Sequence, residues 1–189
     1  MSIGTRATLN DLMRFDGKAE LIGGRIVPQM ADGRKPGRVA DRIERSLDDF
    51  CVANGLGEAY GYGVGFAVPE LLSGRESFSP DASFFIGPFA TDPMRFAYGA
   101  PTFAVEVRSE NDYGPAAEIE LRAKRMDYFE AGTLVVWDVD PEAETISVHK
   151  SDRPEFGVPY IRGDIAEAEP AVPGWRIAVE AIFHRVVRS

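Results

Sequence analysis

The chain has 189 residues, 44% apolar and 27% charged, with a single cysteine and a formal net charge of −9. This balance fits one globular domain over residues 1–189 with a sizeable core, and it excludes a disordered or disulfide-stapled chain. No stretch resembles a signal peptide or a membrane span, so we expect a cytoplasmic protein without membrane contact. The acidic net charge disfavours non-specific nucleic-acid binding, although local clusters of arginine decide that point.

The first half of the chain mixes helical and extended patterns. Helices are expected over residues 6–16 and 37–53, the second ending at Asn54-Gly55, because glycine commonly terminates a helix. Between them, "AELIGGRIVPQ" places two apolar runs around a pair of glycines, which indicates a tight β-hairpin. Strands are also expected in "YGYGVGFAVPE" and "FSPDASFFI", before a loop rich in proline and glycine at residues 87–101.

The second half begins with "PTFAVEVRS" at residues 101–109, whose alternation is typical of a β-strand. A helix is expected over residues 115–131, with Pro115 in its first turn and Gly132 just past its end. "TLVVWDVD" is typical of a buried strand, "TISVHK" pairs with it across "PEAE", and "PGWRIAVEAIF" closes the domain. Two helices packed on a mixed β-sheet predict an α/β or α+β fold.

Two carboxylates lie inside apolar, strand-like segments. Glu106 is in the middle of "PTFAVEVRS", where it is either on the solvent side of the strand or a buried acid with a chemical role. Asp81 follows Pro80 directly, which indicates either a bulge or surface turn, or a functional position, because aspartate is disfavoured in strands. If the two strands are neighbours, the carboxylates can meet at one end of the sheet. Such oxygen ligands suit Mg²⁺ or Mn²⁺.

One face of the helix expected over residues 115–131 carries an unusual lysine. At 100° per residue, Lys124 shares a narrow face with four apolar or aromatic residues, which are Ala117, Leu121, Tyr128 and Ala131. A lysine in this setting either extends past its aliphatic stem to water or directs its ammonium inward at a carboxylate or phosphate. The pattern on its own leaves both interpretations open.

The same helix has a second apolar stripe, formed by Ile119, Ala123 and Met126, roughly opposite the Lys124 face. A helix that is apolar on two sides is either deeply buried or covered by a partner. We therefore expect a homodimer.

A basic stripe lies on the helix expected over residues 37–53. Arg38, Arg42 and Arg45 follow each other at i, i+4 and i+7, beside an apolar stripe that would face the core. The stripe is either an ordinary solvated face or a surface for the phosphates of a nucleic acid.

The order of several motifs resembles that of a known family. "SPDASFF", "FAVEVRS" and "AKRMDYFEAGTLVVWDVDPEAETISVHK" follow one another as in the Uma-two family of predicted endonucleases, within the PD-(D/E)xK superfamily. "AELIGGRIV" and "VPGWRIAVEAIF" extend the resemblance over nearly the whole chain. The resemblance implies a restriction-endonuclease-like mixed β-sheet flanked by helices.

The resemblance also implies roles for individual residues. Asp81 and Glu106 would be the acidic ligands of Mg²⁺ or Mn²⁺, and Glu20 in "AELIGG" matches a further acidic position of the site. The third position of the usual ExK triplet is Arg108, so the catalytic lysine would come from the following helix as Lys124. Arg108 itself could then touch a phosphate of the substrate.

These roles would make the chain a metal-dependent endonuclease that hydrolyses DNA phosphodiester bonds. The acidic net charge and the missing ExK lysine leave a second interpretation. In it, the chain keeps the nuclease fold as a non-catalytic or vestigial binding module.

Overall fold

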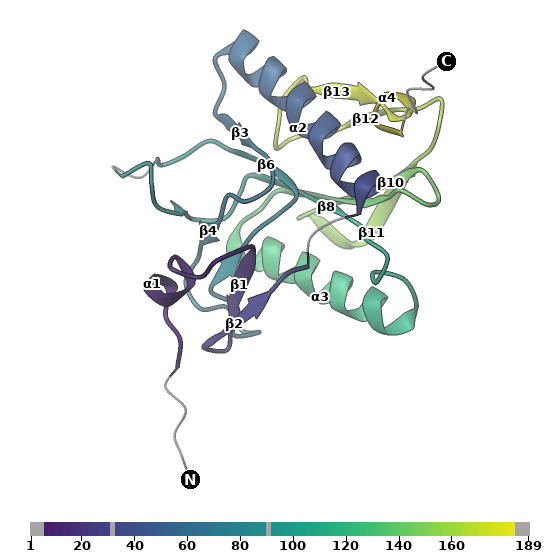
Figure 1. The fold of residues 1–189 in the computed structure, drawn as a ribbon. Coiled ribbons are helices and arrows are strands. Elements are labelled where there is room, and N and C mark those ends of the chain that lie inside the picture. Colours follow the sequence, from purple (N-terminus) through teal and green to yellow (C-terminus); the bar gives the residue numbers. More distant parts are fainter. Residues whose placement is uncertain (1–5, 31–32, 90–91, 184–189) are drawn as a thin grey trace.

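The structure, a computed structural model, describes residues 6–30, 33–89 and 92–183. Its centre is a six-stranded sheet (Figure 1), ordered β11 (Arg153–Tyr160), β10 (Thr145–Lys150), β9 (Val135–Asp140), β8 (Phe103–Val107), β6 (Ala82–Phe85) and β3 (Glu58–Tyr60). β8 and β9 run parallel, whereas the other neighbours are antiparallel. The predicted mixed sheet flanked by helices is therefore confirmed.

Two long helices cover opposite faces of this sheet (Figure 1), α2 (Arg34–Asn54) on one and α3 (Pro115–Ala131) on the other. The core on the α2 side contains the stacked indoles of Trp137 and Trp175. On the α3 side, the ring of Tyr128 stacks on Phe78 at 4.1 Å between centroids. Because helices cover both faces of β8, every residue of this strand is buried except Glu106, which is partly buried.

Smaller elements surround the central sheet. They are α1 (Leu9–Leu12), the hairpin of β1 (Ala19–Ile22) and β2 (Arg25–Pro28), the small sheet of β4 (Phe66–Ala67), β5 (Ser77–Phe78) and β7 (Ala97–Tyr98), and the C-terminal β12 (Ile165–Glu167), β13 (Arg176–Ala178) and α4 (Val179–Phe183). The hairpin turns at Gly23 and Gly24, both with positive φ, as a two-residue turn requires. The backbone N–H of Leu21 donates to the Ser77 hydroxyl and so fixes β1 against β5.

Several predicted elements agree with the structure. The hairpin and the helix over residues 115–131 are confirmed, and α2 ends where predicted, at Gly55 with a left-handed backbone. It begins at Arg34, three residues earlier than predicted. Gly33 precedes it and has no side chain that could cap the helix, so the sequence carries no capping signal for this boundary.

Other elements differ from the prediction. The helix expected over residues 6–16 is only four residues long, and the glycine-rich stretch after residue 58 forms two strands in different sheets. Gly63, with φ of +100°, breaks that stretch. β11 was missed because it is an edge strand without clear apolar alternation. Within the described residues, no helix is long and apolar enough to cross a membrane.

Candidate active site

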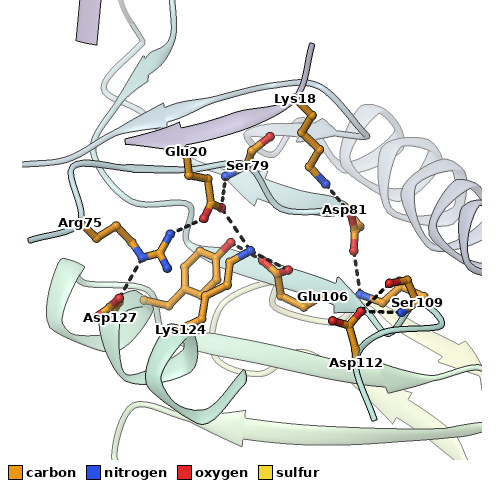
Figure 2. Close-up of polar contacts among 12 residues, drawn as sticks. Lys18, Glu20, Arg75, Ser79, Asp81, Glu106, Ser109, Asp112, Lys124 and Asp127 are labelled. Carbon is orange, nitrogen blue, oxygen red and sulfur yellow. Dashed lines mark hydrogen bonds and ion pairs between the residues drawn. The ribbon is translucent and has the colours of Figure 1, made fainter. Parts of the chain in front are cut away.

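The Glu106 side chain points from β8 toward α3 (Figure 2) and is only 17% exposed. One carboxylate oxygen, Oε2, accepts a hydrogen bond from Lys124 Nζ at 2.9 Å. The other, Oε1, accepts from the Tyr128 hydroxyl at 2.6 Å. Glu106 is therefore a largely buried acid held at both carboxylate oxygens and not the solvent side of an amphipathic strand.

Asp81 lies just before β6 and beside the end of β8, and its side chain is 7% exposed. Its Oδ2 accepts the backbone N–H of Val107 at 2.8 Å, so the carboxylate is fixed to the strand that carries Glu106. Its Oδ1 accepts from Lys18 Nζ at 2.6 Å (Figure 2). A surface turn at Asp81 is excluded, and the predicted approach of the two acidic strands is confirmed by the β6–β8 pairing.

Lys124 directs its ammonium inward. Nζ lies 2.9 Å from Glu106 Oε2 and 3.1 Å from Glu20 Oε1, and the side chain is 16% exposed. Burial alone would lower the pKa of Lys124, but the negative charges of Glu106 and Glu20 outweigh burial and raise it above its ordinary value. Lys124 is therefore a permanent cation at neutral pH, and the alternative of a solvent-directed lysine is wrong.

Glu20 extends from β1 to the same group of side chains, which we call the acidic cluster and which includes Asp81, Glu106 and Lys124. Its Oε1 accepts the backbone N–H of Ser79 at 3.0 Å, and its Oε2 is paired with the guanidinium of Arg75. Burial opposes ionisation of Glu20, yet Lys124, Arg75 and the Ser79 N–H together lower its pKa to about 2. The further acidic position that the resemblance implied is thus brought to the other two carboxylates.

Two cations of this cluster were missed from the sequence. Arg75 donates from Nε to Asp127 Oδ2 at 2.8 Å and also pairs with Glu20, so one guanidinium joins β1 to α3. Lys18 pairs with Asp81 and places its ammonium 4.5 Å from the centre of the Tyr62 ring. Lys18 and Glu20 are two residues apart at the start of β1, and this strand spacing was the only local sign that they face one site.

The cluster faces a cavity of about 410 Å³ between the β1–β2 hairpin, β8 and α3. Its lining includes all three acids and all three cations, namely Lys18, Glu20, Arg75, Asp81, Glu106 and Lys124. Burial raises the pKa of Glu106, and the nearby negative charges of Asp81 and Glu20 raise it further, against the opposing effect of Lys124. Glu106 and Asp81 therefore repel each other, and a cation between them would relieve this repulsion.

The carboxylates of the cavity differ from a closed protein cage for a metal ion. Among the described residues, no group of three or more histidine, cysteine, aspartate or glutamate side chains is arranged to hold a metal ion. Mg²⁺ usually takes one or two carboxylates and completes its shell with water and phosphate oxygens. Asp81 and Glu106, at the wall of an open cavity, fit this requirement for a hydrated ion of the Mg²⁺ or Mn²⁺ type.

Arg108 does not have the surroundings that the resemblance implied. Its Nε donates to Asp138 Oδ1 at 2.8 Å, Nη2 donates to Asp138 Oδ2 at 2.8 Å, and Nη1 is bound to Glu118. These contacts raise the pKa of Arg108 and compensate its charge with two carboxylates. The guanidinium ties β8 to β9 and α3, and the structure gives no support to a phosphate contact.

The three arginines predicted as a basic stripe have different surroundings in the structure. Arg42 Nη1 donates to the backbone carbonyl of Ile182 at 2.8 Å and thereby fastens α4 to α2. Arg45 is exposed farther along the helix. Arg38 is exposed near the start of α2 and lines a second cavity, which it shares with Asp81.

The mixed sheet between two helices, with its acidic cluster at the ends of β6 and β8, is a restriction-endonuclease-like fold. A family model described as "Putative restriction endonuclease" (Uma2) matches residues 8–180, so the chain belongs to this family. Among curated proteins, none matches the chain.

A solved structure from Anabaena variabilis, described as a "putative nuclease belonging to DUF820", is similar to this chain with a TM-score of 0.72. The likeness covers 93% of this chain and 97% of the other, at 16% sequence identity. At that identity the comparison confirms the fold.

The depressed pKa of Glu20 predicts how stability depends on pH. A carboxyl with a folded-state pKa of about 2, against an ordinary 4.5, stabilises the fold fully above its unfolded pKa and loses this effect as the pH falls toward 2. We expect Glu20→Gln to be several kcal/mol less stable than the wild type at pH 7, because Arg75 and Lys124 lose a buried counter-charge. The difference between the two proteins in the free energy of unfolding should shrink as the pH falls below 4.5, the ordinary pKa of a glutamate carboxyl.

Urea unfolding followed by tryptophan fluorescence, in EDTA at several pH values, measures this effect. Glu110→Gln removes an exposed carboxylate and serves as the control. The same pH dependence for Glu20→Gln and the wild type would contradict the assignment.

Proposed function

We propose that the chain is a divalent-metal-dependent nuclease that hydrolyses phosphodiester bonds of DNA. The observation that carries the proposal is the meeting of Asp81, Glu106 and Lys124 at one cavity, from three elements that are far apart in the sequence. Membership of a family described as restriction endonucleases supports it. An acid pair and a buried lysine are the groups that metal-assisted phosphoryl transfer uses.

In this proposal, Asp81 and Glu106 hold an ion of the Mg²⁺ or Mn²⁺ type. Such an ion, when bound, lowers the pKa of a water molecule and neutralises charge on the phosphate. Glu106 and Glu20 raise the pKa of Lys124, which favours its charged ammonium form. It donates hydrogen bonds to the attacking water or to a phosphate oxygen that gains negative charge in the transition state.

The neighbouring residues hold these groups in place before any substrate binds. Tyr128 fixes the Oε1 atom of Glu106, and Glu20 fixes the ammonium of Lys124 from the side opposite Glu106. Arg75 fixes Glu20 in turn. Preorganised charges of this kind need no rearrangement as the reaction proceeds, which is the main source of electrostatic catalysis.

A second candidate function is nucleic-acid binding without hydrolysis. The favouring observation is that each acid of the cluster already has a cationic partner, with Lys18 on Asp81 and Lys124 on Glu106. A site neutralised by its own lysines can persist without a metal ion. Calorimetry separates the two candidate functions. The nuclease should bind Mn²⁺ in a way that Glu106→Gln abolishes, whereas the binding module needs no such Mn²⁺ binding.

The hydrolytic proposal predicts cleavage of plasmid or single-stranded DNA in the presence of Mg²⁺ or Mn²⁺. Asp81→Asn, Glu106→Gln and Lys124→Met should each lower the rate by about a hundredfold or more, because each removes a charge needed in the transition state. Glu155→Gln, which changes a half-exposed acid paired with Arg122, is the isosteric control and should keep full activity. Wild-type activity in Lys124→Met, or a pure protein inactive on every nucleic acid tested, would refute the proposal.

Lys18 is predicted to compete with the metal ion for Asp81. Its ammonium holds Oδ1 at 2.6 Å, and the two side chains are only 5% and 7% exposed, so an ion that uses this oxygen must displace it. Lys18→Met should therefore tighten Mn²⁺ binding about tenfold or more in calorimetry, since the removed charge also repels the ion.

The matched control is Lys150→Met, which removes a lysine from a pair with Glu167 at 2.9 Å away from the cluster. This control should leave Mn²⁺ affinity unchanged. Unchanged or weaker Mn²⁺ binding in Lys18→Met would mean that the lysine and the ion do not share Asp81.

We also propose that the chain forms a homodimer through the outer face of α3. The predicted apolar stripe lies open there, with Ile119 71% exposed and Met126 36% exposed. Light scattering should give twice the 20.7 kDa mass of one chain for the wild type, and that of one chain for Ile119→Asp. A monomeric wild type would contradict this proposal.

A further inference from the structure

A second cavity adjoins the candidate active site on the α2 side of Asp81. It measures about 550 Å³ and lies between the first turns of α2 and the Gly61-Tyr62 segment that follows β3. Asp81 lies in the walls of both cavities. A molecule in the second cavity would therefore lie directly beside the acidic cluster. The volume is in the range of pockets that enclose a small organic ligand, such as one nucleotide.

Two arginines in this cavity have charges that no described residue compensates by direct contact. Arg34 and Arg38 both line it, and among the described residues neither makes a hydrogen bond or ion pair. By contrast, Lys35 is bound to the backbone carbonyl of Pro141, and Arg42 to that of Ile182. The free cations near the start of α2 are thus the ones that face the cavity, where they can pair with phosphate oxygens.

A glycine in α2 keeps this cavity open. Gly37 lies inside the helix, where glycine costs about 1 kcal/mol relative to alanine. A Cβ atom placed on Gly37 would have no other heavy atom within 4 Å, so the side of the helix above it is empty space. The sequence therefore accepts a helix-destabilising residue where a side chain would enter the cavity.

An aromatic ring and acceptor groups complete the lining. Tyr62 is 52% exposed, and the Lys18 ammonium that binds Asp81 also lies over its ring, which places the ring beside the cluster. Asp41 and Glu44 contribute carboxylates from the next turns of α2. An exposed ring can stack on a nucleobase, and carboxylates can accept hydrogen bonds from its amino groups.

We propose that this cavity binds one nucleotide of a single-stranded substrate, next to the bond that is cleaved. Arg34 and Arg38 contact the phosphates of this nucleotide, and Tyr62 stacks on its base. A concave pocket can enclose a base only when that base is not stacked and paired within a duplex, so the cavity selects single strands. The inference rests on the proposed function, since it takes the acidic cluster beside the cavity as the place of cleavage.

Fluorescence anisotropy tests the cavity with a labelled single-stranded oligodeoxynucleotide and with a duplex of the same sequence. EDTA is present throughout, so that binding is measured without cleavage. The wild type should bind the single strand at least about tenfold more tightly than the duplex. Gly37→Leu should weaken single-strand binding about tenfold, because its side chain fills the cavity, while its melting temperature stays equal or rises.

Two control variants make the test specific. Ala53→Leu adds the same side chain at an exposed position near the end of α2 and should bind as the wild type does. Arg38→Gln should weaken binding and reduce the slope of log affinity against log salt by about 0.7, the value for one single-strand phosphate contact. Arg14→Gln, an exposed arginine next to α1, should leave the slope unchanged.

Three results would overturn the inference. They are wild-type affinity in Gly37→Leu, duplex binding as tight as single-strand binding, and a loss in Arg45→Gln equal to that in Arg38→Gln. Equal losses in Arg45→Gln and Arg38→Gln would place the single-stranded nucleic acid on the outer face of α2. A separate cleavage assay distinguishes the two proposals: binding that depends on Gly37 without any cleavage refutes only the nuclease, whereas cleavage with full binding in Gly37→Leu refutes only the cavity.

Discussion

Burial of the Glu106 carboxylate between β8 and α3 carries a desolvation cost that the surrounding residues must offset. Lys124 provides the opposite charge, but a buried lysine between two acids also needs its position fixed, and Glu20 does this from the other side. Glu20 is itself buried and requires Arg75, which in turn requires Asp127 on α3. One buried acid thus leads to a chain of alternating charges that joins β8, α3 and β1.

This chain of charges links the β1–β2 hairpin to α3 beside the cavity. β1 has only four residues and could not keep its place by backbone pairing alone. Its Glu20 side chain makes ionic contacts with both Arg75 and Lys124, and its backbone is bound to Ser77. Removal of one member takes an ionic partner from each of its neighbours, so the site and the local fold depend on the same contacts.

The sequence was sufficient for the parts of the site that depend on local pattern. Glu106 stood out as an acid in the middle of an otherwise apolar strand segment, and Lys124 as a cation on an apolar helix face. Arg75 gave no such sign, since it lies in a turn-rich loop and its partners Glu20 and Asp127 are 55 and 52 residues away. Arg42 was misleading for the same reason: its partner is 140 residues farther along the chain. Periodicity reports which face of an element a residue occupies, but long-range charge pairing is determined only when the elements come together.

Arg108 and Lys18 together show how the positive charges are divided. Arg108 occupies the position at which the resemblance in the sequence implied a lysine, yet its planar guanidinium is bound to two carboxylates. The flexible lysines reach the acids instead, Lys124 from α3 and Lys18 from the start of β1.

In the proposed function, a phosphate that enters past Asp81 brings negative charge to a carboxylate whose charge is offset by Lys18. The phosphate can approach favourably only while a cation stays between it and the Asp81 carboxylate. If a metal ion displaces Lys18 from Asp81, the freed ammonium remains near the Tyr62 ring and adds to the positive charge that the entering strand meets. In this arrangement the ion and the nucleic acid favour each other's binding, because each reduces the electrostatic repulsion that the other meets alone.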